Sequence, residues 1–488
     1  MRYVSPSLFI QWLKQEVTPA LGCTEPVAIA FTAAYAARYL PGPCERISGF
    51  ISANLYKNAM GVTIPGTTVS GVSLAAAIGA FGGHADKGLR ALEGITEHHV
   101  ELANALINTG NVTINVEDTS DFIHLDLTLL AAGQSCRVVV KGTHTNVVAL
   151  YLNDEPLALE QPDGKAANPH ALPTFSLRDA FDFITAAPAE EIAFILEAGR
   201  LNSALSQEGK RKKYGLNING AFADAVNKGL MSNDLMSKVI IDTVAASDAR
   251  MGGAPVIAMS NFGSGNQGIT ATMPVVTVAN HLNADEDTLA RALALSHLTA
   301  ISIHSRYTRL SALCAASTAA MGSAAGMAWL FTRDPDVINA AITNMVSDIT
   351  GMICDGASNS CAMKVSSVVS SAFKAVLMAM QNSCASANDG IVCRDVEQTI
   401  NNLCRLVVHP MTHTDKEIIS IMVDKSFPRD AVLVDSVAHW THEAVVSGSS
   451  GSYRRSCCTA RTDVPASDHR RASAASSQRP HGCGLGRR

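Results

Sequence analysis

Hydrophobic positions along the chain follow two spacings, and the change between them divides the sequence. Ser7 to Val17 and Pro26 to Tyr39 carry apolar residues at helical spacing, which predicts two helices. From about Arg46 the pattern changes to short β-branched and apolar runs typical of strands. These runs cover 47–55, 112–116, 123–130, 137–140 and 147–152, with helical stretches near 73–80 and 100–108 between them. We therefore expect an α+β module here.

Helical spacing returns from Leu177 to about Val423. The stretches with this spacing are 178–184, 189–204, 285–301, 336–346, 365–380 and 395–408, and glycine-rich loops are expected at 251–268 and 351–361. The polar, proline-containing segment 153–173 is expected to be a return linker. The pattern thus predicts an α+β fold in which residues 1–42 and 174–425 form a mainly helical domain. Residues 43–173 form the smaller inserted α+β domain and its linker.

The C-terminal segment, residues 426–488, departs from both spacings. It is rich in Ser, Arg, Pro and Gly, and its arginine pairs lack periodic apolar partners. Such a composition does not bury enough surface to offset the entropy of ordering, so we expect disorder. We treat Cys457, Cys458 and Cys483 as outside the chemistry of the protein.

Composition narrows the class of protein. Over 488 residues the charged fraction is 17%, the hydrophobic fraction is 47%, and the net charge of −5 gives no reason to expect nucleic acid. The N-terminus lacks the apolar core of a signal peptide. The longest uncharged stretch, Leu310 to Phe331, is dominated by small residues, which favours a buried helix over a membrane span. We expect a cytoplasmic protein, in which twelve cysteines bind metal, catalyse or pack.

Four of the cysteines lie in segments rich in small and turn-forming residues. Cys314 ends Arg309-Leu-Ser-Ala-Leu-Cys314, and Cys354 and Cys361 lie in Gly351-Met-Ile-Cys-Asp-Gly-Ala-Ser-Asn-Ser-Cys-Ala-Met-Lys364. Cys23 lies far upstream, between Pro19 and Pro26. Thiolates in such surroundings suit a soft metal or an iron–sulfur cluster, and three ligands would leave one iron open as a Lewis acid. Free cysteines also pack as small hydrophobic residues, and spacing alone leaves both interpretations open.

Other motifs allow competing chemistry. Gly263-Ser-Gly-Asn-Gln-Gly268 matches a dinucleotide fingerprint, but that site needs a helix to open at the third glycine, and the β-branched run ending at Pro274 argues against one. The loop would either grip a small carboxylate or form a structural turn. Lys364 is a weak candidate for a pyridoxal phosphate lysine. A zinc site built from Cys354, Cys361 and a histidine lacks the tight spacing of structural zinc.

Several longer motifs occur in one order along the chain. They are 19–26 around Cys23, 57–67, 201–209, 246–253, 263–268, 309–314 and 351–364. Together they resemble the L-cysteine desulfidase family, which is related to the iron–sulfur L-serine dehydratase alpha chain. The resemblance runs from about Ser7 to Lys425.

The resemblance implies a serine-dehydratase-alpha-like catalytic domain and a mechanism. Cys314, Cys354 and Cys361 would hold a [4Fe–4S] cluster with one open iron, and Cys23 would be the nearby base. L-Cysteine would undergo β-elimination to pyruvate, ammonia and sulfide in an oxygen-sensitive lyase. Residues expected to contact the substrate are Asn58, Ser264, Asn266, Gln267 and Arg309. Iron–sulfur L-serine dehydratase and a non-catalytic iron–sulfur amino-acid sensor remain alternatives, and a homodimer is a further expectation.

Overall fold

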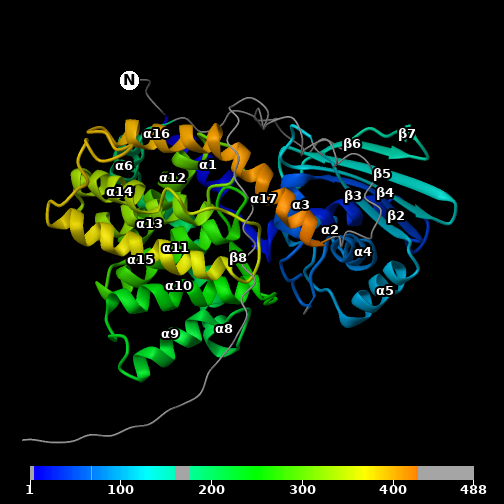
Figure 1. The fold of residues 1–488 in the computed structure, drawn as a ribbon, viewed down its shortest axis with the longest axis horizontal. Coiled ribbons are helices and arrows are strands. Elements are labelled where there is room, and N and C mark those ends of the chain that lie inside the picture. The colour runs from blue at the N-terminus through cyan, green and yellow to red at the C-terminus, as the bar shows by residue number, and fades with distance from the viewer. Residues whose placement is uncertain (1–4, 68, 118, 160–174, 427–488) are drawn as a thin grey trace, which may run out of the picture. The chain divides into compact units, whose positions relative to one another are not determined.

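The computed structural model describes residues 5–67, 69–117, 119–159 and 175–426, which belong to one compact unit (Figure 1). Most of the predicted linker, 160–174, lies outside the described residues. Disorder is predicted for residues 426–488, and residues 427–488 also lie outside the described residues.

A mixed six-stranded sheet forms the α+β part of the fold. Its strand order is β3-β2-β4-β5-β6-β7, with β2 and β3 parallel and the other neighbours antiparallel. The strands are β2 (Arg46–Ser52), β3 (Val112–Glu117), β4 (His124–Ala131), β5 (Gln134–Lys141), β6 (Val147–Leu152) and β7 (Glu155–Pro156). Helix α2 (Thr24–Ala37) lies against β4 and β5, and it packs on α4 (Val72–Gly82), which in turn packs on α5 (Glu97–Asn108) (Figure 1). The sheet and its helices confirm the predicted α+β composition.

The first predicted strand ends earlier in the structure than the sequence pattern predicts. Helix α3 (Ala53–Ala59) begins directly after β2 and takes in the last residues of the predicted run 47–55. Lys57 and Asn58 therefore lie on a helix. The 3₁₀ helix η1 (Ala85–Arg90) follows α4 and contacts α2 and β1 (Pro19–Leu21).

Helices build the rest of the fold around α13 (Ala315–Thr332). The others are α1 (Pro6–Glu16), α6 (Leu177–Ala186), α7 (Ala189–Ile192), η2 (Ala193–Ile195), α8 (Leu196–Arg211), α9 (Ile218–Asn227), α10 (Leu235–Met251), α11 (Gly265–His281), α12 (Glu286–His304), α14 (Pro335–Ile349), α15 (Cys361–Met380), α16 (Val396–Val408) and α17 (Pro410–Ser426). Helix α13 packs against α11, α12, α14 and α15, and it is buried from Ala316 to Trp329. Its small residues let neighbouring backbones approach closely. The buried helix predicted within 310–331 is confirmed.

The prediction that no helix follows Gly263–Gly268 is wrong. Helix α11 begins at Gly265, where the Ser264 hydroxyl accepts the Gln267 backbone N–H at 3.3 Å, and it continues through Pro274. A proline removes one helical hydrogen bond, but every residue from Gly265 to Ala279 is buried, so packing outweighs that cost. The dinucleotide interpretation fails for another reason. The preceding strand β8 (Ile257–Met259) pairs antiparallel with β1 and belongs to no βαβ unit.

Two large hydrophobic clusters lie inside the described residues. One joins α1 with the helices from α6 onward, and the other joins α2, α4 and the sheet. Helix α2 thus contributes its buried side chains to the cluster of the sheet. The domain boundaries at residues 42 and 174 stay a prediction.

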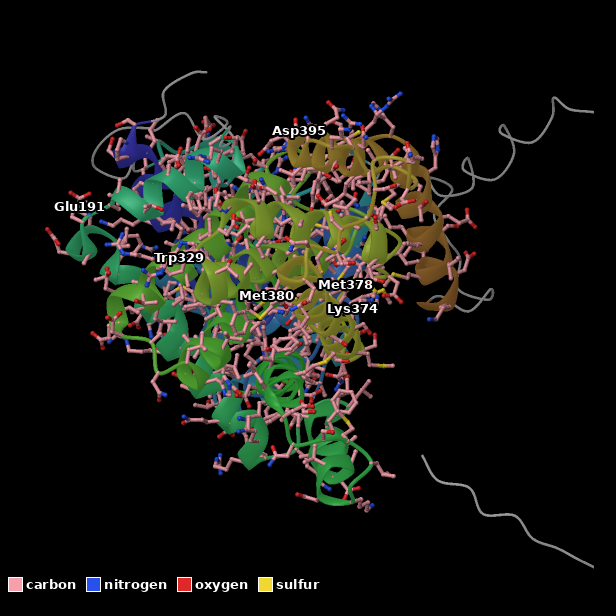
Figure 2. All side chains as sticks on the ribbon, turned by 90° about the vertical axis from the view of Figure 1, so that its left-hand side faces the viewer. Glu191, Trp329, Lys374, Met378, Met380 and Asp395 are labelled. Carbon is pink, nitrogen blue, oxygen red and sulfur yellow. The ribbon has the colours of Figure 1, made fainter. Side chains whose placement is uncertain are left out.

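One helix among the described residues, α15, is long and apolar enough to cross a membrane by length and composition. Half of it is buried inside the protein. Figure 2 shows Lys374 and Met378 one turn apart on this helix, and the Lys374 ammonium pairs with Asp348 at 2.7 Å. A core helix meets the same two criteria, so α15 is weak evidence for a membrane span.

Candidate active site

A short antiparallel bridge between two loops brings Cys314 and Cys354 together. Leu313 pairs with Ile353. The Cys354 N–H donates to the Ala312 carbonyl at 2.7 Å, and the Cys314 N–H donates to the Met352 carbonyl at 2.9 Å. Backbone hydrogen bonds thus hold residues forty positions apart in the sequence in adjacent loops.

Three of the four motif cysteines lie at the N-termini of long helices. Cys23 immediately precedes α2, Cys314 immediately precedes α13, and Cys361 is the first residue of α15. The backbone N–H of Ser358 also points to the Cys361 sulfur at 3.4 Å. The positive end of a helix stabilises negative charge, so these positions favour thiolates or an anionic ligand.

A tight turn carries Cys23 to Cys361. Strand β1 pairs with β8 and ends just before Gly22, whose φ is +70°. A Cβ at residue 22 would lie 2.0 Å from Pro65 Cγ, so only glycine fits. Cys23 then packs with Val62 and Met251, and Cys361 lies against this small cluster. All four predicted cysteines therefore occupy one region of the protein.

Burial and mutual repulsion raise the pKa values of the thiols. Burial, and then the neighbouring Cys354 and Cys361, raises the pKa of Cys314 to about 12. Burial, and then Cys354, raises the pKa of Cys361 to about 11. Without metal these thiols stay protonated at neutral pH. A soft metal that displaces their protons would couple its binding to pH.

The donor set fits a cluster better than a single ion. No three His, Cys, Asp or Glu side chains in the described ranges are arranged to hold one metal ion, which argues against the zinc alternative there. In an iron–sulfur cluster each thiolate binds a different iron, so its ligands stand further apart than those of one ion. One buried thiol, Cys314, and two half-buried thiols, Cys354 and Cys361, act on one another electrostatically and fit a cluster with one iron left free of protein ligands.

Cys23 donates a hydrogen bond into a buried acidic group. Its Sγ lies 3.0 Å from Glu25 Oε2, and the Thr24 hydroxyl donates to the same oxygen at 3.1 Å. His144 Nε2 lies 3.8 Å from Glu25 Oε1. Burial raises the pKa of Glu25, but His144, Cys23 and Arg250 outweigh burial and lower it to about 2. An ionised carboxylate thus stands beside the Cys23 thiol, whose own pKa burial and Glu25 raise well above its usual value.

Lys57 and Asn58 reach the cysteine loops from α3. The Lys57 ammonium is fully buried, donates to the Ser311 and Cys354 carbonyls at 3.3 Å, and pairs with Asp415 of α17 at 2.5 Å. Asn58 Oδ1 lies 3.9 Å from Cys354 Sγ. Lys57 therefore connects the loops of Cys314 and Cys354, and Asn58 lies beside Cys354; the substrate role of Asn58 stays a prediction.

The other expected substrate contacts already have partners inside the protein. Arg309 forms a two-pronged ion pair with Glu16 at 2.8 and 3.0 Å. Gln267 donates to Asn261 Oδ1 at 2.9 Å and lies 2.7 Å from His304 Nδ1. Asn266 Oδ1 accepts from the Ser247 hydroxyl, and Ser264 caps α11. The substrate roles of Ser264, Asn266, Gln267 and Arg309 stay predictions.

The sequence pattern did not identify three residues that lie at the site. Glu25 adjoins Cys23, His144 adjoins Glu25, and the buried Arg250 donates from Nε to the Gly22 carbonyl at 3.0 Å. Each lies inside a motif noted above or in the turn 142–146, but nothing local in the sequence predicts that it is buried. Lys364 argues against a pyridoxal lysine. Burial lowers its pKa, but the ion pair with Asp355 outweighs burial and raises it, the opposite of what an imine-forming lysine needs.

Comparison with known proteins places the chain in a family. Residues 86–420 match the model of the serine dehydratase alpha chain. A UPF0597 protein of Klebsiella pneumoniae is 77% identical over 419 residues, which cover 86% of this chain and 99% of that protein. UPF0597 protein YhaM of Escherichia coli K12 is 49% identical over 424 residues, covering 86% and 97%. A UPF0597 protein of Actinobacillus pleuropneumoniae is 48% identical over 421 residues, covering 85% and 96%.

The fold and these matches define a serine-dehydratase-like protein, and the class indicates a lyase-type enzyme. The chain belongs to the serine dehydratase alpha chain family and, within it, groups with the UPF0597 proteins.

Proposed function

We propose that the protein is a cytoplasmic L-cysteine desulfidase that converts L-cysteine and water to pyruvate, ammonia and sulfide. The observation that carries the proposal is the convergence of Cys23 on Cys361, close to the bridged loops of Cys314 and Cys354. Cys23 thus lies beside the three other thiols. In this arrangement Cys23 can transfer a proton while the other three bind metal.

Cys314, Cys354 and Cys361 would hold a [4Fe–4S] cluster. When bound, the cluster supplies an open iron, which acts as a Lewis acid toward the leaving group. The helix N-termini at Cys314 and Cys361 stabilise the negative charge of thiolate ligands. Lys57 holds the two bridged loops in place through the Ser311 and Cys354 carbonyls.

Cys23 would remove the proton from the substrate Cα. Its own proton points at Glu25 Oε2 in the resting protein, and the ionised Glu25 is too weak a base to remove it. The positive charge of Arg250 acts in the opposite direction to Glu25 and favours the thiolate that serves as base. His144, on the other side of Glu25, supports the negative carboxylate. Loss of the α-proton and cleavage of the Cβ–S bond give sulfide and aminoacrylate. Aminoacrylate tautomerises to the imine, and water hydrolyses the imine to pyruvate and ammonia.

A product assay on anaerobically prepared protein tests the proposal. Incubation with L-cysteine should release sulfide, pyruvate and ammonia in equal amounts, without added pyridoxal phosphate. L-Serine, assayed beside it, should be turned over more slowly, since sulfur binds iron more strongly than a hydroxyl does. Faster turnover of L-serine would reassign the protein as a serine dehydratase. Binding of L-cysteine without any product would favour the sensor alternative.

A further inference from the structure

Arg250, near the C-terminal end of α10, is a buried cation that lacks an acidic partner. Only 3% of the residue is exposed, and it takes part in no ion pair with a carboxylate within the described ranges. Its Nε donates to the Gly22 carbonyl, and its Nη1 lies 3.2 Å from the Met251 sulfur, which is a weak acceptor. The ionised Glu25 acts on Arg250 through space but forms no ion pair with it, so the guanidinium keeps N–H donors for a further anion.

The guanidinium of Arg250 also lies against the first turn of α11. A Cβ built on Gly265, the first residue of this 17-residue helix, would lie 2.1 Å from Arg250 Nε and 2.6 Å from its Cζ. A helix N-terminus carries partial positive charge. Two positive groups pressed together in a buried site repel each other, and a bound anion relieves that repulsion. Helix ends of this kind bind carboxylates and phosphates.

The position of Arg250 links this anion site to the candidate active site. Its Nε binds the carbonyl of the residue that precedes Cys23. Its positive charge acts on Cys23, Glu25 and Cys361, and it lowers the pKa of each. An anion bound at this guanidinium would therefore lie beside the proposed base and one proposed cluster ligand.

We infer that Arg250 and the N-terminus of α11 bind the α-carboxylate of the amino-acid substrate. This inference rests on the proposed function. The forked guanidinium suits a two-oxygen carboxylate, and a carboxylate fixed there would present its Cα to Cys23. Arg309, the arginine that sequence reasoning assigned to the substrate, already binds Glu16 in this way.

The test compares two thiols that differ in one group. 3-Mercaptopropionate carries a carboxylate, and cysteamine carries an amine in its place. Binding of each to anaerobically reconstituted protein is measured by isothermal titration calorimetry, and the visible absorption of every variant is recorded. Arg250→Gln should weaken binding of 3-mercaptopropionate at least about tenfold and leave cysteamine within about twofold, because only the first ligand loses an ion pair.

A second variant keeps the charge and moves it. Gly265→Ala places a methyl group where the guanidinium packs, so it should produce the same selective loss of 3-mercaptopropionate binding. If Arg250→Gln fails to fold, Gly265→Ala tests the carboxylate site in its place. Arg306→Gln is the matched control. It removes a half-buried guanidinium that pairs with Glu397 at 2.6 Å, and it should change neither affinity.

Two results would overturn the inference. One is unchanged affinity for 3-mercaptopropionate in both variants. The other is an equal loss for both ligands, or loss of the visible absorption, which would mean that Arg250 serves the thiol site. Failure of the proposed function looks different. Arg250-dependent binding of 3-mercaptopropionate without sulfide release from L-cysteine would contradict the desulfidase assignment and leave the carboxylate site standing.

Discussion

Two buried polar regions near the N-terminus of α11 differ in how their groups are satisfied. The amide–histidine network consists of Asn261, Gln267, Thr272, His297 and His304. Its members bond to one another: Gln267 joins Asn261 to His304, and Asn261 lies 2.9 Å and Thr272 3.0 Å from the two ring nitrogens of His297. The thiol site consists of Cys23, Cys314, Cys354, Cys361 and Arg250. Cys354 and Cys361 raise the pKa of Cys314, Cys354 raises the pKa of Cys361, and the arginine forms no ion pair with a carboxylate in the described ranges.

The difference separates scaffold from chemistry. A network whose members bond mainly to one another stabilises one conformation and has few groups left for a ligand. Within the described residues, His304 Nε2 is the buried atom of this network that lacks a hydrogen-bond partner. A region that gathers thiols and a guanidinium with unused N–H donors keeps groups available for a ligand. We therefore expect substitutions in the thiol site to change chemistry more than stability, and substitutions in the network to do the reverse.

The largest effect is expected at Cys354. Cys354→Ser removes one of the three thiolates proposed to hold the cluster and replaces it with a hard, poorly ligating hydroxyl. Visible absorption after anaerobic reconstitution, and sulfide production, should both fall to background. The matched control is Cys393→Ser, which changes another half-buried free cysteine and should retain both. Full activity in Cys354→Ser would remove Cys354 from the ligand set.

Cys23 should separate the base from the cluster ligands. Cys23→Ala should keep the visible absorption and lower kcat by about 100-fold or more, the usual effect of losing a general base. Steady-state kinetics with L-cysteine and the absorption spectrum measure the two properties in the same sample. An active Cys23→Ala variant would show that another group takes the α-proton, and a colourless one would make Cys23 a ligand.

Gln267 tests the other side of the comparison. Gln267→Met keeps the size of the side chain but leaves Asn261 Oδ1 and His304 Nδ1 without their partner, which should cost about 2–4 kcal/mol of unfolding free energy. Urea denaturation measures this cost, and Gln398→Met, at an exposed position, is the control. A stable variant with a sharply raised KM would instead support the substrate role that the sequence suggested.

The smallest effect concerns acid stability. Burial lowers the pKa of His297 to about 3, whereas an unfolded histidine titrates near ~6.5. Between these values the unfolded state binds more protons, so stability rises with pH, and it is lost as pH falls below ~6.5. The unfolding free energy should fall by about 1.4 kcal/mol per pH unit for this histidine. His297→Gln should reduce the slope between about pH 6 and 4.5 by that amount, and an equal slope would contradict neutral burial.

Local sequence pattern predicted the parts of the fold in which one spacing dominates. Strands β2 to β6 and helices α12, α14 and α16 fall close to their expected ranges, whereas β7 lies in the segment expected to be a linker. Helix α11 was missed because its β-branched residues and Pro274 are locally unfavourable in a helix, and only its complete burial compensates. Burial of that kind depends on packing against α8, α10, α12 and α13, which the local pattern within α11 does not predict.

The candidate site was predictable in its residue types and not in its contacts. The order of the cysteine motifs pointed to Cys23, Cys314, Cys354 and Cys361 through a family resemblance, and the structure brings them into one region. Arg250 lies in an ordinary helical stretch, where an arginine is usually exposed. The local sequence therefore predicts neither that Arg250 is buried nor that it forms no ion pair. Arg309 looked available because its partner, Glu16, lies 293 positions away.

The most direct test of the account is the visible absorption spectrum of anaerobically reconstituted protein, recorded before and after addition of L-cysteine. The account predicts a broad iron–sulfur absorption that changes when L-cysteine is added, with sulfide and pyruvate appearing in the same sample. A protein that stays colourless yet makes pyruvate, or whose absorption ignores L-cysteine while turnover proceeds, would contradict it.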